Sequence, residues 1–295
     1  MSIHPSAVAI SFDGAVATVE MRRPPHNFFT IGLITQLADA FEDLEADRRC
    51  HSIVLAAQGA SFCAGADFTK REPPGRDAAA PAPAPAPAPA PCGDEASRER
   101  PVEISRDTAP AQRSPRALNP IYAEALRLFA CGKPVVAAVH GAAVGGGLGL
   151  ALVADFRVTC PEARFSANFN RLGFHPGFGL SVTLARLVGP QQAALLFYTG
   201  RRIGGEQALA IGLADVLVAQ DQVRAEAARL ALEIAISAPL AVQSTRASLR
   251  RGLVEQIRAA VAHESTEQNA QFKTADFVEG VAAMAARREP RFTGQ

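Results

Sequence analysis

The segment from Lys133 to Ala154 constrains the fold more than any other stretch, because its character changes twice along its length. Val135 to Val139 is a short run of β-branched and small apolar residues, which is typical of a buried strand. Leu148 to Ala154 is apolar and free of helix breakers, which predicts a buried helix. Between them stand three successive glycines, Gly145 to Gly147, which add no packing and cost backbone entropy. The segment therefore predicts a strand, a turn of bare backbone and a helix.

A glycine turn that opens a helix presents unpaired N–H groups, which can hold an anion or a carbonyl oxygen that is gaining negative charge. The glycines are not spaced as Gly-x-Gly-x-x-Gly, which excludes a dinucleotide fingerprint. No Lys-Ser or Lys-Thr follows them, which excludes a P-loop. From this turn alone, two interpretations stay open: a site for an anion or a carbonyl oxygen, or a close helix–strand crossing that needs only small residues.

A second turn of the same kind lies earlier in the chain. Ser61 to Asp67 reads Ser-Phe-Cys-Ala-Gly-Ala-Asp and directly follows an apolar run, Ser52 to Ala57, that is typical of a strand. The two turns together, in this order, resemble those of the crotonase (enoyl-CoA hydratase/isomerase) superfamily. In that family each turn offers one backbone N–H to the thioester oxygen of an acyl-CoA. The resemblance implies that Ala66 and Gly146 are the two donors.

Composition agrees with a soluble, cytoplasmic enzyme. Hydrophobic residues make up 48% of the 295 residues and charged residues 20%, which is ordinary for a globular protein. The net charge of +1 gives no electrostatic reason to expect a nucleic acid or a membrane as partner. Five cysteines without a Cys-x-x-Cys pair argue against a disulfide framework or a metal site and favour a reducing compartment. The first residues lack the pattern of a signal peptide.

The resemblance implies an α/β fold, a spiral of repeated ββα units with a C-terminal helical region that builds a homotrimer or a dimer of trimers. We expect the spiral core in residues 1–205 and the helical region in residues 206–295. Residues 72–117 are predicted to be an insertion, because alternating alanine and proline from Ala80 to Pro91 disfavours helix and removes N–H donors. This excursion, Pro73 to Pro115, is interpreted as a tolerated, extended or disordered insertion, or alternatively as a lid.

The proton-transfer group is where the sequence departs from the family. Hydratases of this family carry one glutamate two positions after the three glycines and another about twenty residues later. The corresponding positions here are Gly149 and Phe169, neither of which can move a proton. His175, in Phe-His-Pro-Gly-Phe-Gly, is the best replacement, because a neutral imidazole is a competent base near pH 7. The alternative for His175 is a loop histidine bonded to backbone.

The remaining site residues follow from the same resemblance. Around the two donors, the substrate site is expected to include Cys63, Ala64, Asp67, Gly145, Gly149 and Phe169, and Arg287 is a candidate for the CoA phosphates. Arg287 can equally be a solvated helix end. Other polar residues have blander interpretations: His26 and His140 as structural, Asp67 and Asp155 as caps, and Cys63 as a buried filler.

The sequence therefore predicts an acyl-CoA thioester enzyme, a lyase or isomerase of fatty acid or aromatic acid catabolism, that stabilises a thioester enolate. It is expected to need no cofactor beyond the coenzyme A thioester of its substrate, and no metal. Two alternatives stay open. One is a C–C bond (ring-opening) hydrolase of the same superfamily, and the other is a non-catalytic homologue that binds acyl-CoA.

Overall fold

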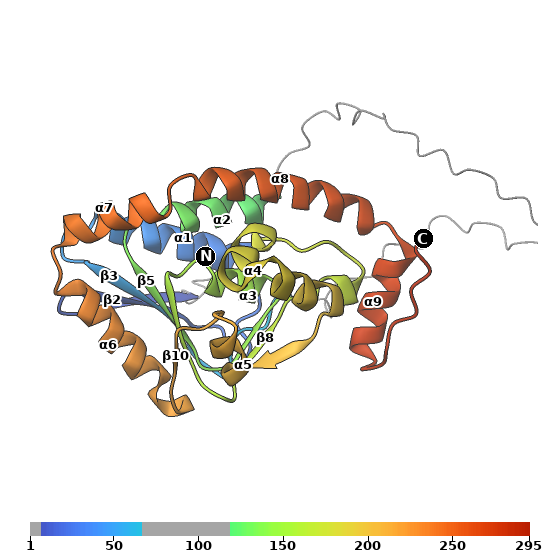
Figure 1. Ribbon diagram of the computed structural model, residues 1–295, viewed down its shortest axis with the longest axis horizontal. Coiled ribbons are helices and arrows are strands. Elements are labelled where there is room, and N and C mark those ends of the chain that lie inside the picture. Colours follow the sequence, from blue (N-terminus) through green and yellow to red (C-terminus); the bar gives the residue numbers. More distant parts are fainter. Residues whose placement is uncertain (1–6, 67–118) are drawn as a thin grey trace, which may run out of the picture. The chain divides into compact units, whose positions relative to one another are not determined.

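A computed structural model describes residues 7–66 and 119–295 of the chain (Figure 1). Asp67 and the proline-rich excursion from Pro73 to Pro115 lie outside the described residues. The described residues belong to a single compact unit.

The larger sheet begins with a hairpin and continues with parallel strands. Its order is β1-β2-β3-β5-β7-β10, in which only β1 and β2 pair antiparallel. The turn between them is Asp13-Gly14, a pair that the sequence alone identifies as a hairpin turn, and Gly14 has the positive φ (+55°) that glycine allows. The strands are β1 (Val8–Asp13), β2 (Val16–Met21), β3 (Ser52–Ala57), β5 (Val135–Val139), β7 (Phe156–Thr159) and β10 (Val216–Leu217).

Three of the strands of the smaller sheet, β4, β6 and β8, each follow a strand of the larger sheet. Its order is β4-β6-β8-β9, with β4, β6 and β8 parallel and β9 antiparallel to β8. The chain thus passes from β3 to β4, from β5 to β6 and from β7 to β8, and a helix follows the last two of these pairs. This repetition confirms the predicted α/β spiral. The strands are β4 (Ser61–Cys63), β6 (Ala142–Val144), β8 (Arg164–Ser166) and β9 (Arg202–Gly204).

Helices cover both faces of the larger sheet (Figure 1). On one side α1 packs against β1, β2 and α2, and α8 crosses α2; on the other, α6 packs against β2, β3, β5 and β7. Both β10 and α6 lie C-terminal to residue 205, so residues 206–235 pack with the sheet rather than apart from it. The helices are α1 (Ile31–Ala46), α2 (Pro120–Ala130), α3 (Gly146–Ala151), α4 (Leu180–Thr199), α5 (Gly205–Ala210), α6 (Val223–Ala235), α7 (Pro239–Leu249), α8 (Leu253–Gln271) and α9 (Ala275–Ala285), with 3₁₀ turns η2 (Asn170–Leu172) and η3 (Gln220–Gln222).

Local sequence signals fix several helix ends. Thr30, a residue type favoured at helix N-caps, caps α1, because its side chain accepts a hydrogen bond from the N–H of Leu33. Helix α4 begins at Leu180, breaks at Gly189, resumes and continues to Thr199. Gly189 interrupts the helical backbone with φ +77°, and Pro190 can begin the next helical turn because that position needs no N–H partner.

A network of charges at the amino end of β5 holds α7 in place. Asp155 accepts hydrogen bonds from the N–H of Val135 (2.9 Å) and from the side chains of Arg246 (2.8 Å) and Arg250 (2.9 Å). Asp155, which was predicted to be a cap, therefore also pairs with two arginines of the α7 region. Beside it, the fully buried Arg157 donates to the Leu213 carbonyl and to other oxygens around it. Buried charges of this kind are stabilised only when their hydrogen bonds are satisfied.

The C-terminal tail folds back on α9 through acidic side chains. Glu279 pairs with Arg288 and accepts the N–H of Arg291, while Asp276 accepts from the N–H groups of Thr293 and Gly294. The hydrogen bond from Arg288 and that from the Arg291 backbone hold the pKa of Glu279 at about 2, below its ordinary 4.5.

We expect this tail contact to weaken in acid. Because the pKa of Glu279 is lower in the folded than in the unfolded chain, its stabilisation is present above the ordinary pKa and is lost as the pH falls toward the folded value. The melting temperature of Glu279→Gln should lie below that of wild type at about pH 6, and the difference should shrink below about pH 4 and close only below about pH 2. Glu289→Gln, on the same exposed tail, should show no such difference. A difference that persists unchanged at about pH 2.5 would contradict the assignment.

Candidate active site

The two predicted turns lie side by side because the strands before them are paired. Strands β4 and β6 run parallel, with Ser61 opposite Ala142 and Cys63 opposite Ala143, so their carboxyl ends meet. A Cβ atom added to Gly147 would lie 2.0 Å from the carbonyl oxygen of Cys63. One added to Gly65 would lie 2.7 Å from the carbonyl oxygen of Val144. The close approach of the two backbones explains why glycine stands at both positions.

The amides of Ala66 and Gly146 are both open in these turns. The N–H of Gly145 donates to the Ser166 carbonyl (2.9 Å) and that of Gly149 donates to the Gly145 carbonyl (3.1 Å). Among the described residues, no oxygen accepts a hydrogen bond from the N–H of Ala66 or of Gly146. Ala66 is exposed and Gly146 is half-buried, so both amides are accessible from outside the core.

An aromatic pair, Phe29 and Phe178, lies over the start of α3. The Phe29 ring would be 3.2 Å from a Cβ on Gly146. The backbone N–H of Phe29 donates to the Gly65 carbonyl (2.9 Å). The Phe178 ring would be 2.7 Å from a Cβ on Gly149. The two rings meet edge to face with their centroids 5.0 Å apart. The sequence analysis missed both residues, because neither is near the glycines in the chain.

The ring of Phe178 thus occupies the space that a side chain at position 149 would need. We expect Gly149→Glu to destabilise the fold by about 3 kcal/mol, because the new side chain would overpack a buried site. Phe178→Ala in the same chain should recover part of this loss, since it removes the ring that the glutamate meets. Thermal and denaturant unfolding of the two single variants and the double variant measure this coupling. Strict additivity of the two single effects would contradict the contact.

Phe169 lies on the other side of the glycine turn. Its ring would be 3.7 Å from a Cβ on Gly145, and it packs edge to face on Phe174. Phe174 in turn contacts Phe272 and Phe277, at the end of α8 and on α9. Phe169 therefore joins the turn to an aromatic cluster that reaches the last helix.

His175 lies against α8. Its N–H donates to the side chain of Gln271 (2.6 Å), and its carbonyl accepts from Gln268 (2.8 Å). The ring Nδ1 is 2.8 Å from the Pro176 carbonyl oxygen, and the ring meets that of His263 edge to face at 5.5 Å. Within the described part of the chain, the His175 ring contacts these neighbours and neither of the two glycine turns.

The other predicted residues are more dispersed. Cys63 is fully buried, and burial raises the pKa of its thiol to about 12, so it is inert at neutral pH. Ala64 donates its N–H to the His26 carbonyl (3.0 Å). Arg287 is exposed beyond the end of α9, with φ +53°, and its N–H donates to the Met284 carbonyl (3.1 Å). Asp67 lies outside the described residues.

Glu264 is a buried carboxylate that the sequence analysis did not single out. It lies on α8 and accepts hydrogen bonds from the N–H of Gly179 (2.8 Å), the N–H of Ser181 (3.2 Å) and the hydroxyl of Ser181 (2.6 Å). It thereby caps the start of α4 from a distant helix. Burial raises the pKa of Glu264 above its ordinary value. In the sequence it is one of many helical glutamates, with no local signal of its role.

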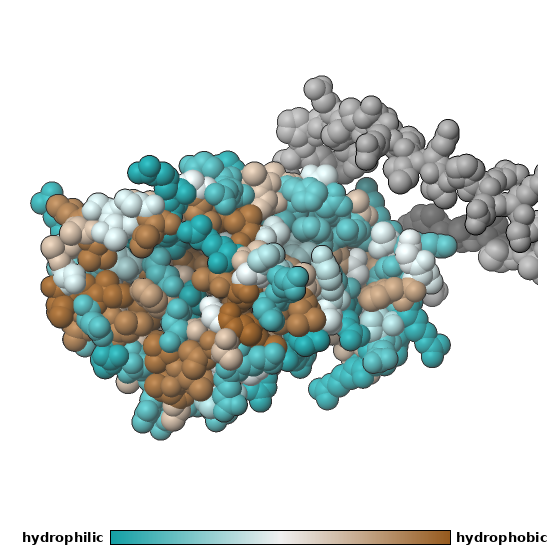
Figure 2. All heavy atoms as spheres, viewed as in Figure 1, coloured by the Kyte–Doolittle hydropathy of each residue, from teal (hydrophilic) through white to brown (hydrophobic). Residues whose placement is uncertain are grey.

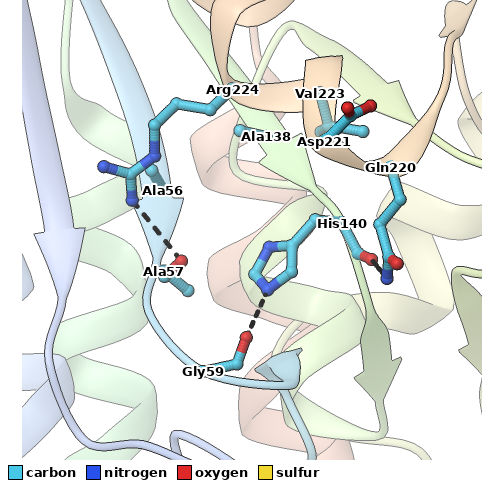
Figure 3. A pocket seen from close by; sticks show the side chains of 9 residues that line it. All are labelled: Ala56, Ala57, Gly59, Ala138, His140, Gln220, Asp221, Val223 and Arg224. Atoms are coloured by element: carbon cyan, nitrogen blue, oxygen red, sulfur yellow. Dashed lines mark hydrogen bonds between the residues drawn. The ribbon is translucent and has the colours of Figure 1, made fainter.

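A separate cavity of about 230 Å³ opens at the carboxyl ends of β3 and β5 (Figure 3). His140 lies beside it, with Nε2 2.9 Å from the Gly59 carbonyl oxygen, and its own carbonyl accepts from Gln220 (2.9 Å). Arg224, near the start of α6, and Asp221, in the preceding turn η3, complete its polar edge (Figure 3). Neither glycine turn lines this cavity, so it is distinct from the candidate site.

Comparison with known proteins agrees with this arrangement. A profile of the enoyl-CoA hydratase/isomerase family matches residues 11–81 and 109–295. The chain belongs to this family. A probable enoyl-CoA hydratase of Mycobacterium tuberculosis is 35% identical over 246 residues, covering 82% of the chain and 81% of that protein. The enoyl-CoA hydratase domain-containing protein 2, mitochondrial, of Bos taurus is 31% identical over 286 residues, covering 95% of the chain and 85% of that protein.

Solved structures share the fold over nearly the whole chain. The enoyl-CoA hydratase/isomerase of Pseudoalteromonas atlantica superposes with a TM-score of 0.76 at 25% identity, covering 97% of this chain and 100% of that one. No helix in the described ranges is long and apolar enough to span a membrane.

Proposed function

We propose that this family member is an acyl-CoA enzyme that stabilises a thioester enolate between the N–H groups of Ala66 and Gly146. The observation that carries the proposal is the pairing of β4 with β6, which sets on adjacent turns two accessible amides that have no acceptor within residues 7–66 and 119–295. Each well-placed donor of this kind contributes about 3–4 kcal/mol to the stabilisation of an oxyanion. The reaction uses no cofactor beyond the coenzyme A thioester of the substrate.

We further propose that the reaction is not hydration by two glutamates. Gly149 and Phe169 stand where the resemblance to the hydratases puts those glutamates, and Phe178 fills the space beside Gly149. His175 is proposed as the proton-transfer group, because it is the only histidine of residues 168–179 and an imidazole is the side chain most often used for general acid–base catalysis. C–C bond hydrolysis is the second candidate, favoured by the absence of both glutamates together with the presence of His175.

A mass-spectrometric screen tests the proposal. The full-length protein is incubated with a panel of acyl-CoA thioesters that includes crotonyl-CoA, and products are scored for gain or loss of water, isomerisation or cleavage. Conversion of at least one thioester supports an enzyme. Binding without any conversion would support the non-catalytic alternative, and rapid hydration of crotonyl-CoA would overturn the proposed departure from hydratase chemistry.

We also propose that the chain assembles as a homotrimer or a dimer of trimers. None of the residues of α7 is buried, and Ile236, Leu240 and Leu249 are 78%, 78% and 71% exposed. Figure 2 shows hydrophobic residues on the surface where α6 meets α7. Large apolar side chains gathered in this way are more typical of a subunit interface than of a monomer surface.

Light scattering measures this assembly. We expect the wild-type mass to be a multiple of 31.0 kDa, and the double variant Ile236→Glu/Leu240→Glu to dissociate it. Tyr198→Glu is the matched control, because Tyr198 is 76% exposed but lies on α4. A wild-type monomer at micromolar concentration would contradict the proposal.

A further inference from the structure

Phe178 is held in a backbone conformation that phenylalanine rarely adopts. Its φ of +63° lies in the left-handed region, where a bulky side chain is strained. The residue is nevertheless 1% exposed and stands between two glycines, Gly177 and Gly179, of which Gly179 has φ +71°. A strained conformation in the core persists only where the surroundings fix it, so neighbouring groups must hold the turn from Gly177 to Gly179 in place.

Side chains of α8 fix the turn from outside the spiral. Glu264 accepts the N–H of Gly179, the residue directly after Phe178. One helical turn further along α8, the side chain of Gln268 accepts a hydrogen bond from the hydroxyl of Tyr122 (2.6 Å) and donates one to the His175 carbonyl (2.8 Å). Glu264 and Gln268 are both almost completely buried. The turn is therefore clamped on both sides of Phe178 by one face of α8.

The ring that this clamp holds lies beside the candidate site. Gly146 and Gly149 are three residues apart on α3, so they face the same side of the helix. The Phe29 ring covers the first and the Phe178 ring the second. An acyl group whose thioester oxygen is bound at the N–H of Gly146 would therefore extend toward the ring of Phe178.

We propose that Phe178 is a specificity-determining residue that restricts the site to short acyl groups, and that Glu264 is the positioning residue that holds Phe178 there. The proposal rests on the proposed acyl-CoA function. The space beside Gly146 and Gly149 is taken up by the rings of Phe29 and Phe178. These two rings therefore limit the length of the acyl chain that the site can hold. Glu264 holds Phe178 through its hydrogen bonds to the backbone of Gly179 and to the side chain and backbone of Ser181.

Calorimetric titration with saturated thioesters tests the first part, because these ligands have no double bond to hydrate. The ratio of the octanoyl-CoA to the butyryl-CoA dissociation constant is compared between wild type and Phe178→Ala. We expect the variant to shift this ratio toward octanoyl-CoA by at least about tenfold, since it vacates the volume of a ring. Phe178→Leu should shift it in the same direction by less. Phe41→Leu, a buried ring on α1, is the matched control and should leave the ratio unchanged.

The outcomes separate this proposal from the proposed function. If wild type binds neither thioester more tightly than free coenzyme A, the acyl-CoA function fails and this inference fails with it. If wild type binds them and both Phe178 variants keep its ratio, the role of Phe178 is overturned while the acyl-CoA function stands.

A double-variant comparison tests the positioning role. Glu264→Gln keeps the shape of the side chain but replaces one acceptor oxygen by an NH₂ donor, which cannot accept from Gly179 or Ser181. We expect it to move the ratio part of the way toward that of Phe178→Ala, and to cause no further change when Phe178→Ala is already present. Ser181→Ala removes one donor to Glu264 and should act in the same direction with less cost in stability. A loss of stability in these variants with an unaltered ratio would overturn the positioning role.

Discussion

Gly146→Pro is expected to lower the turnover of acyl-CoA thioesters by about 10²–10³-fold or more, because it removes one of the two proposed oxyanion donors. Proline has no N–H, and Gly146 is the first residue of α3, a position where a helix tolerates proline. The substitution therefore deletes the donor while the hydrogen-bonding pattern of the helix is retained. Turnover is measured on whichever thioester the mass-spectrometric screen shows to be converted.

Gly146→Ala is the matched control for this variant. It introduces the same Cβ, 3.2 Å from the Phe29 ring, but keeps the N–H. A ring must move by a few tenths of an ångström in both variants, so any effect of crowding appears in both. We expect the alanine variant to retain most of the turnover. An equal loss in the two variants, with cooperative unfolding preserved, would assign the effect to crowding and count against the oxyanion site.

The elements that the sequence predicted well are those set by local chemistry. Strands β3 and β5 begin and end at the predicted residues, because each is a short apolar run bounded by polar or breaking residues. The cap at Thr30 and the hairpin turn at Gly14 depend on one or two neighbouring residues. The adjacency of the two glycine turns came from the resemblance, and the structure supplies its cause in the pairing of β4 with β6.

What the sequence did not reveal are contacts between distant segments. Phe29 and Phe178 are 149 positions apart, yet their rings meet beside the glycines. Glu264 caps a helix that begins 84 residues earlier, at Leu180. No local pattern distinguishes such a phenylalanine from a core residue, or such a glutamate from a solvated one. The positive φ of Phe178 is equally hidden, because a residue between two glycines has no propensity that predicts it.

The second large effect is expected at His175. Its Nδ1 is 2.8 Å from the Pro176 carbonyl oxygen, and a carbonyl can only accept, so Nδ1 carries the proton. In the neutral ring, Nε2 then has the free lone pair, as a general base requires. Two hydrogen bonds fix the backbone that carries the ring. The N–H of His175 donates to the side chain of Gln271, and the His175 carbonyl accepts from the side chain of Gln268.

We therefore expect His175→Ala to lower turnover by about 10²–10⁴-fold and to leave acyl-CoA binding nearly unchanged. His263→Ala is the control: it removes the imidazole whose centroid lies 5.5 Å away on α8, and it should have little effect on turnover. Equal losses in the two variants would indicate a structural role for the histidine pair. If His175→Ala instead turns over substrate at the wild-type rate while Gly146→Pro does not, the oxyanion site stands. The proton released when the enolate forms must still be accepted by a base. In that case the base is another residue or a group on the substrate itself.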